Sequence, residues 1–263
     1  MSLLTIKLAV TPLMVLAASL AARRWGDSVG GWLVGLPLTS GPVAVFLAIE
    51  RGPAFASQAA GGSLAGVVAQ AAFCAAYMAL APRGLAAALA SGSLAYAAAG
   101  AALVAANLPQ PALFLVSVGA LTAVLGVTPR KAVTAQAVGW RGVAARMAAT
   151  TALVVGLTSA ASALGPEVSG VSASFPLIGA SMAVFVHLGA GPAAAVAVLR
   201  GMVAALYAFA VFFLALGGVL TWLPTAEAFA LATAAALIAQ GATLTLVRSA
   251  GAGKASAPPP ERT

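Results

Sequence analysis

Long apolar stretches with hardly a charge inside them are the feature that most restricts the fold of this chain. Charged residues stand in clusters between these stretches, and each stretch approaches the ~20 residues that cross a ~30 Å hydrocarbon core as a helix. Hydrophobic residues make up 62% of the 263 residues and charged residues only 7%. A soluble domain of this length has no means of hiding so much apolar side chain, so the chain belongs in a bilayer.

The apolar stretches are predicted to be helices, because a backbone in lipid must satisfy its own N–H and C=O groups. Barrel strands would alternate apolar and polar residues, whereas these stretches are solidly apolar. We therefore predict an all-α integral membrane protein with nine transmembrane helices. The predicted helices are Ile6–Ala22, Gly30–Ile49, Phe55–Leu80, Gly84–Ala106, Pro111–Val127, Ala144–Leu164, Gly170–Leu188, Ala193–Leu220 and Pro224–Val247.

The sequence also repeats itself at one constant spacing, the repeat offset. Residues 31–74 match residues 170–213 without a gap, with 15 identities in 44 positions. Six identities are alanine pairs, and the other nine include a Pro-Leu and a Gly-Pro dipeptide in register. Two copies of a multi-helix block are therefore predicted. The predicted units are a first repeat of five helices (1–129), a basic cytoplasmic linker (130–143), a second repeat of four helices (144–248) and a disordered tail (249–263).

The basic residues set an orientation. If the loop after the first helix is cytoplasmic, nine basic loop and tail residues lie inside, and Arg51 alone lies outside. The nine are Arg23, Arg24, Arg83, Arg130, Lys131, Arg141, Arg248, Lys254 and Arg262. The N-terminus is then outside and the C-terminus cytoplasmic. Since five helices separate equivalent points, the second repeat is threaded upside down, an inverted topology typical of secondary transporters.

Each copy carries Pro and small residues half-way along one helix, the second and the seventh. Pro removes a backbone donor, and a break in lipid is tolerated where protein or a water-filled cavity covers the freed backbone. One interpretation is a substrate site built from both breaks, and the other is a pair of simple kinks packed against neighbours. The candidate substrate-binding residues at the breaks are Pro37, Thr39, Ser40, Gly41, Ser174, Pro176, Gly179 and Ser181.

Two further candidates lie in the hairpin formed by the seventh and eighth helices. Arg200 stands about eight residues, or ~12 Å, inside the eighth helix, where a charge costs several kcal/mol unless it finds a partner. It is interpreted either as an anchor for an anion or as a side chain that snorkels to lipid phosphate. His187, the one histidine, is interpreted either as a titrating gate or as an interfacial residue.

Residue types that are missing narrow the chemistry. The five acidic residues all lie at predicted helix ends or in the tail, so a buried carboxylate proton carrier is not expected. No metalloprotease, P-loop or dinucleotide motif occurs, so we predict neither an enzyme, nor a metal site, nor a cofactor. The net charge of +8 is explained by cytoplasmic loops facing anionic lipid, so nucleic acid is not an expected partner.

The segment from Gly30 to Pro42, followed by Glu50-x-Gly52-Pro53, resembles uncharacterised bacterial inner-membrane proteins. It is also similar to the small GlpM-type membrane proteins, in which a Phe-Pro stretch leads towards a His-containing helix end, as Phe175-Pro176 leads to His187 here. The resemblance covers one helix hairpin per copy. It implies a duplicated and inverted version of a small dimeric ancestor in the bacterial inner membrane, and it implies no substrate.

The sequence therefore predicts a secondary transporter or exporter of a small solute, working by alternating access around the broken helices. The alternative is a membrane scaffold or accessory subunit that packs a partner protein. A solvent-reachable cavity at Thr39, Ser40, Ser174 and Ser181 would favour the transporter, and solid packing there would favour the scaffold. The expected partners are the solute and the lipid bilayer, with a homodimer left open.

Overall fold

The structure, a computed structural model, describes residues 40–128 and 175–252 and eight separate positions nearer the N-terminus. These positions are Leu13, Leu16, Ala17, Leu20, Ala21, Arg24, Trp25 and Trp32. Within the two ranges every regular element is a helix. The predicted linker 130–143 and the predicted helix 144–164 lie outside the described residues, as does most of the predicted first helix.

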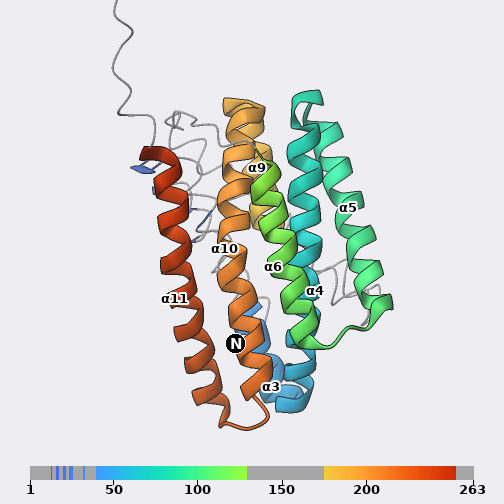
Figure 1. Cartoon of the computed structure of the whole chain (residues 1–263), viewed down its shortest axis with the longest axis vertical. Coiled ribbons are helices and arrows are strands. Elements are labelled where there is room, and N and C mark those ends of the chain that lie inside the picture. Colours follow the sequence, from blue (N-terminus) through green and yellow to red (C-terminus); the bar gives the residue numbers. More distant parts are fainter. Residues whose placement is uncertain are drawn as a thin grey trace, which may run out of the picture.

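Five of the described helices are long and apolar enough to cross a membrane. They are α4 (Pro53–Leu80, continued by the short η1, Ala81–Arg83), α5 (Leu85–Ala106), α6 (Gln110–Val127), α10 (Pro192–Val219) and α11 (Thr225–Ala252) (Figure 1). Two shorter helices, α3 (Ser40–Arg51) and α9 (Leu177–Ala190), lie at opposite ends of the bundle. The protein is thus an all-helical, membrane-spanning type over its described ranges.

Most predicted boundaries agree with the structure to within one or two residues. Helices α4 and α10 begin slightly earlier than predicted, at Pro53 and Pro192, because proline is well suited to the first helical position. The end of α11 is the larger difference. It continues to Ala252, so the predicted disordered tail starts too early: residues 249–252 are helical.

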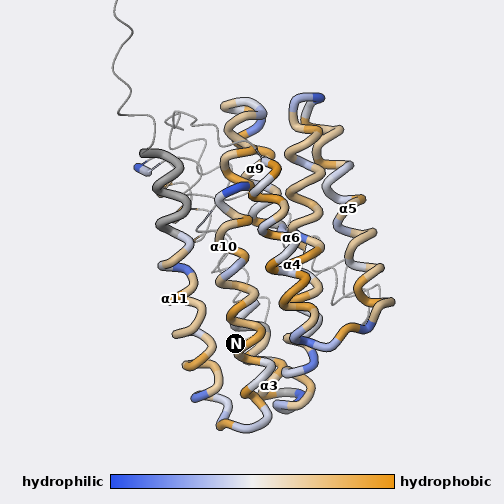
Figure 2. The backbone as a smooth tube through the Cα atoms, viewed as in Figure 1, coloured by the Kyte–Doolittle hydropathy of each residue, from blue (hydrophilic) through white to orange (hydrophobic). Residues whose placement is uncertain are grey.

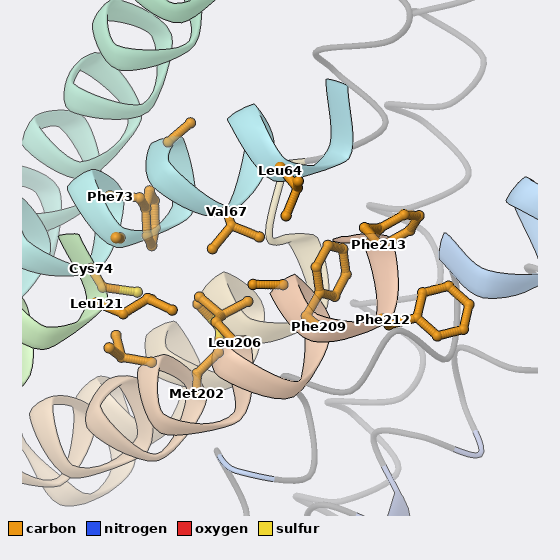
Figure 3. Close-up of a cluster of buried hydrophobic side chains, with 14 of the residues drawn as sticks. Leu64, Val67, Phe73, Cys74, Leu121, Met202, Leu206, Phe209, Phe212 and Phe213 are labelled. Atoms are coloured by element: carbon orange, nitrogen blue, oxygen red, sulfur yellow. The ribbon is translucent and has the colours of Figure 1, made fainter. Parts of the chain in front are cut away.

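Helices α4 and α10 form the centre of the bundle and run in opposite directions (Figure 1). In each of them 67% of the most apolar 18-residue window is buried, against 22% in α5, α6 and α11. Their facing side chains interdigitate in one apolar core, to which α6 contributes Leu121. Figure 3 shows this core, with Leu64, Val67 and Phe73 from α4 opposite Met202, Leu206 and Phe209 from α10.

The outer helices α5, α6 and α11 turn large apolar side chains outward. Leu94, Leu115 and Ile238 are 71%, 69% and 76% exposed, one on each of these helices. Such exposure would be costly in water over so many positions, whereas lipid tails solvate these side chains well. Figure 2 shows the same distribution, with hydrophobic residues along the helices and many of the hydrophilic ones at turns and ends.

Polar side chains between the helices donate to backbone carbonyls of the neighbouring helix. Ser57 Oγ of α4 donates to Gly217 O at 2.7 Å, and Gln110 Nε2 of α6 donates to Phe213 O at 2.8 Å, both on α10. Ser117 Oγ of α6 donates to Leu64 O of α4 at 3.1 Å. Hydrogen bonds of this kind hold helices together in lipid, where water offers no alternative partner.

Two helical hairpins are built in the same way. A single glycine joins α3 to α4 and another joins α9 to α10, and a proline follows each glycine. Gly52 has φ 88° and Gly191 has φ 87°, a left-handed conformation that favours glycine. Helices α4 and α10 are equally long, so the helix ends at 51, 53 and 80 recur at 190, 192 and 219.

Candidate functional site

The described members of the predicted site lie in two short helices. Ser40 and Gly41 are the first described residues of α3, and Gly179 and Ser181 lie in the first turns of α9, soon after Pro176. The other three predicted residues at the breaks, Pro37, Thr39 and Ser174, lie outside the described residues.

The start of α9 and the first described residue of α3 lie about half-way through the bundle. The 12 residues of α3 reach ~18 Å back from Gly52 along α4, whose 28 residues span ~42 Å. The 14 residues of α9 likewise end at the start of α10 and reach ~21 Å along it. Because α3 occupies one end of the bundle and α9 the other, the described part of α3 and the start of α9 reach a similar depth from opposite sides (Figure 1).

Backbone geometry explains where α9 begins. Phe175 lies in a bend, and Pro176 has φ −76° and ψ 58°, which is not helical. Proline has no N–H to offer to a preceding turn, so the regular helix starts at Leu177. The predicted interruption at Pro176 therefore coincides with a helix start in the structure. The helix ends slightly beyond the predicted Leu188, at Ala190.

Aromatic rings surround the start of α9. The ring of Phe175 meets Phe73 of α4 edge-on at 5.5 Å between centroids and Tyr96 of α5 at 5.1 Å. Gly92 of α5 makes room for this cluster, since a Cβ there would lie 3.0 Å from the Phe73 ring. At the start of α3, Gly41 packs near the ring of Phe212 in α10. Phe73 and Phe212 are themselves equivalent under the repeat offset.

The described part of the predicted site is closed. Gly41, Pro176 and Gly179 are buried, and Ser181 is 6% exposed with its hydroxyl donating to Ile178 O at 3.0 Å. Ser40 is half-buried. These residues show solid packing, not a surface open to water, so the structure is either a closed conformation of a transporter or a permanently packed scaffold.

His187 of α9 contacts the α3–α4 hairpin. Its Nδ1 lies 3.1 Å from the hydroxyl oxygen of Tyr77 in α4, and the two rings meet at 70° with centroids 6.0 Å apart. Tyr77 is fully buried and His187 half-buried. The contact joins α9 to α4 near the end of the bundle where both helices terminate.

Arg200 caps a helix. Its Nη1 donates to Leu125 O at 3.0 Å and to the carbonyl and hydroxyl oxygens of Thr128, all at the C-terminal end of α6. A cation is favourable at a helix C-terminus, whose last carbonyls lack helical partners. The described contacts direct Arg200 to α6 and His187 to α4, so they do not bring the two side chains into a shared vestibule.

The sequence did not single out several residues of this region. Tyr77 and Tyr96 are ordinary aromatic residues of apolar stretches, whereas Phe175 was noted only for its place before Pro176 and Phe73 only for its alignment with Phe212. Gln240 is a further polar residue: its Nε2 lies 3.5 Å from Trp32 O, while its Oε1 is buried without a partner. Among the described residues no cluster of His, Cys, Asp or Glu has the makings of a metal site.

Comparison with known proteins adds no relative: the chain matches no protein-family model, no curated protein and no solved structure. The fold by itself defines the class, a helical protein with several membrane-spanning segments. Resemblance to the GlpM-type proteins remains a prediction.

Proposed function

We propose that the protein is a secondary transporter or exporter of a small solute, built from two inverted repeats that work by alternating access. The observation that carries the proposal is the pair of hairpins α3–α4 and α9–α10. Their helix ends recur at the repeat offset, both turns use a left-handed glycine followed by proline, and the two long helices run in opposite directions.

The packing partners support the same relationship. The long helix of each hairpin packs against the helix that follows it, α4 against α5 and α10 against α11, and the two long helices pack against each other. A pseudo-two-fold axis in the membrane plane exchanges these pairs. Transporters with such axes bind their solutes near the midplane, at the N-terminal ends of interrupted helices.

The chemistry of the site follows from its groups. The start of α9 presents backbone N–H groups, and the hydroxyls of Ser40 in α3 and Ser181 in α9 lie at mid-depth. In this proposal the described conformation is occluded, with the Phe73–Phe175 contact closing one break and Phe212 lying over Gly41 at the other. Rocking of one hairpin against the other would open the site to one side at a time.

The proposed location is a bacterial inner membrane, with the N-terminus outside and the C-terminus cytoplasmic. The ends carrying Arg83 and the C-terminal part of α11 lie at one end of the bundle, and Arg51 lies at the other (Figure 1). This distribution agrees with an excess of basic residues on the cytoplasmic side.

Thiol accessibility tests the proposal without knowledge of the solute. Cys74, the one cysteine, is replaced by alanine, and single cysteines are placed at Ser40 and Ser181. Cells and inverted vesicles are then treated with a membrane-impermeant thiol reagent. A transporter exposes at least one of these sites to water from one side during its cycle, whereas a scaffold keeps both unreactive from either side.

Two control positions show what reaction is expected at a water-exposed site and at a lipid-facing site. Trp222→Cys, in a turn and 86% exposed, should react from one side only, and Leu115→Cys, on the lipid-facing surface of α6, should not react. If neither Ser40→Cys nor Ser181→Cys reacts under conditions where Trp222→Cys does, the transport proposal is wrong and the scaffold is favoured.

A further inference from the structure

One side-chain contact in the membrane-embedded part of the described structure involves a histidine: the contact between Tyr77 and His187. It is a hydrogen bond between the two hairpins, from α4 to α9, and one partner is an imidazole, whose ring nitrogens can each carry a proton. Tyr77 lies in the last turn of α4 and His187 in the last turn of α9. The pair therefore closes the end of the bundle towards which both helices run.

The residues equivalent to Tyr77 and His187 under the repeat offset cannot form the same hydrogen bond. Under the repeat offset Tyr77 corresponds to Leu216 and His187 corresponds to Ala48. Leu216 and Ala48 are apolar and buried at the other end of the bundle. The two ends thus differ at these positions: at one end Tyr77 bonds to an imidazole, and at the other the equivalent Leu216 and Ala48 are apolar.

Protonation of His187 changes which of the two groups can donate in this hydrogen bond. With the proton of neutral His187 on Nε2, the Tyr77 hydroxyl donates to Nδ1. A proton added to Nδ1 removes that acceptor, and the Tyr77 oxygen must then accept while its own O–H loses its partner. Because Tyr77 is fully buried, an O–H without an acceptor is costly there, and this cost weakens the contact between α4 and α9.

Other titratable groups near α9 are already engaged or lie at the surface. On α10, Arg200 is directed to the C-terminal end of α6, and on α5, Tyr96 stacks against Phe175. Arg83 of η1 is exposed at the same end of the bundle. On the α10 side, the apolar residues Ala194 and Val198 share a buried cluster with Met182 and Val186 of α9. Tyr77 is thus the one described polar side chain bonded to the imidazole.

We infer that His187 is a proton-binding site, and that its protonation releases the Tyr77 contact and opens this end of the bundle. The proton enters from water on the side where His187 is half-buried and returns there when the contact re-forms. Proton binding at His187 stands independently of transport, while its use as the coupling ion rests on the proposed function.

Nuclear magnetic resonance tests proton binding directly. Because the chain has one histidine, protein labelled with ¹⁵N-histidine and purified without a histidine tag gives a single imidazole. We expect the Nδ1 resonance of an unprotonated, hydrogen-bonded nitrogen at high pH and of a protonated nitrogen at low pH. Tyr77→Phe, which keeps the ring and removes the hydroxyl, should shift Nδ1 at high pH. An Nδ1 that is protonated at all pH values, or is unchanged in Tyr77→Phe, overturns the inference.

Thiol accessibility then tests opening. Ser181→Cys should react about fivefold faster at about pH 6 than at about pH 8 from the α9 end, the change expected from losing one buried hydrogen bond. Ionisation of the cysteine alone would make the reaction faster at the higher pH, and the reaction rate of Trp222→Cys measures the size of that effect. Adding His187→Gln should abolish the acceleration. Reactivity without this dependence overturns the proton-controlled opening but leaves the transporter, whereas failure of both Ser40→Cys and Ser181→Cys to react from either side overturns the transporter.

Discussion

Gly52 and Gly191 are equivalent under the repeat offset and hold the same left-handed backbone, with φ angles of 88° and 87°. Each is followed by a proline that starts a long helix, and the two helices cross the bundle in opposite directions. Neither glycine has a neighbour within 4 Å of an added Cβ, so backbone conformation, not space, explains the residue at both positions.

Alanine at either turn should therefore destabilise the protein. We expect Gly52→Ala and Gly191→Ala each to cost about 1–2 kcal/mol, because a Cβ is unfavourable in the left-handed region. Unfolding in detergent with increasing denaturant measures the loss. Gly62→Ala is the matched control, since Gly62 lies inside α4 with open space around it, and it should be neutral or slightly stabilising. Equal effects at all three positions would contradict the explanation.

Gly217 permits a close contact rather than a turn. A Cβ there would lie 1.9 Å from Gln110 Nε2, so Gly217→Ala should displace Gln110 and break its bond to Phe213 O. We expect a loss of about 1–3 kcal/mol in the same unfolding measurement, the cost of leaving a buried polar group unpaired. The neighbouring Gly218→Ala meets nothing within 4 Å and serves as control.

A double variant sharpens this prediction. If the clash with Gln110 is the cause, Gln110→Ala in the Gly217→Ala background should add much less than Gln110→Ala adds to the wild type. Full additivity of the two substitutions would show that Gly217 matters for another reason.

Arg200 should act on the end of α6. Arg200→Gln removes the cation from the carbonyls of Leu125 and Thr128, and we expect a destabilisation of about 1 kcal/mol. Hydrogen exchange should become faster in the last turn of α6 and remain unchanged in α5. Arg83→Gln, at an exposed position, is the control. Unchanged exchange in α6 would leave the anion anchor as the better interpretation.

Phe73 and Gly92 should be coupled. A Cβ at Gly92 would meet the Phe73 ring at 3.0 Å and the Phe73 carbonyl oxygen at 3.2 Å, and the backbone atom cannot move aside easily. We expect Gly92→Ala to cost about 1–3 kcal/mol through overpacking of α4 against α5. Gly119→Ala, in open space on α6, should not share this cost. Thermal unfolding in detergent distinguishes the two variants.

Hydropathy and helix-end residues predicted the described helices well. The lengths of the apolar stretches predicted the long helices, and the Gly-Pro dipeptides at 52–53 and at 191–192 predicted the turns. Both signals act locally on the backbone. Arg248 and the residues after it misled the prediction. Polarity marks where a segment leaves the lipid, and α11 shows that a helix does not have to end there, since it continues to Ala252.

The candidate site was predicted only in part. Pro176 was associated with a break, and it stands directly before the start of α9, since proline has no N–H to offer to a preceding turn. The role of Arg200 was not predictable, because its acceptors Leu125 and Thr128 lie far away in the chain. The partner of His187 was equally hidden, since Tyr77 is just as distant in sequence and resembles any other buried tyrosine.

The sequence by itself determined the membrane environment, the helical class and the offset that relates two stretches of the chain, because solvation and backbone hydrogen bonding depend on composition and local order. Only the tertiary structure decided that α4 and α10 pack at the centre, that Arg200 caps α6 and that Tyr77 bonds to His187. When a helix in lipid is apolar all round, its pattern of polar residues does not indicate which face packs against a neighbour. The choice of neighbour therefore depends on the fit of glycines, rings and single polar groups brought together from distant parts of the chain.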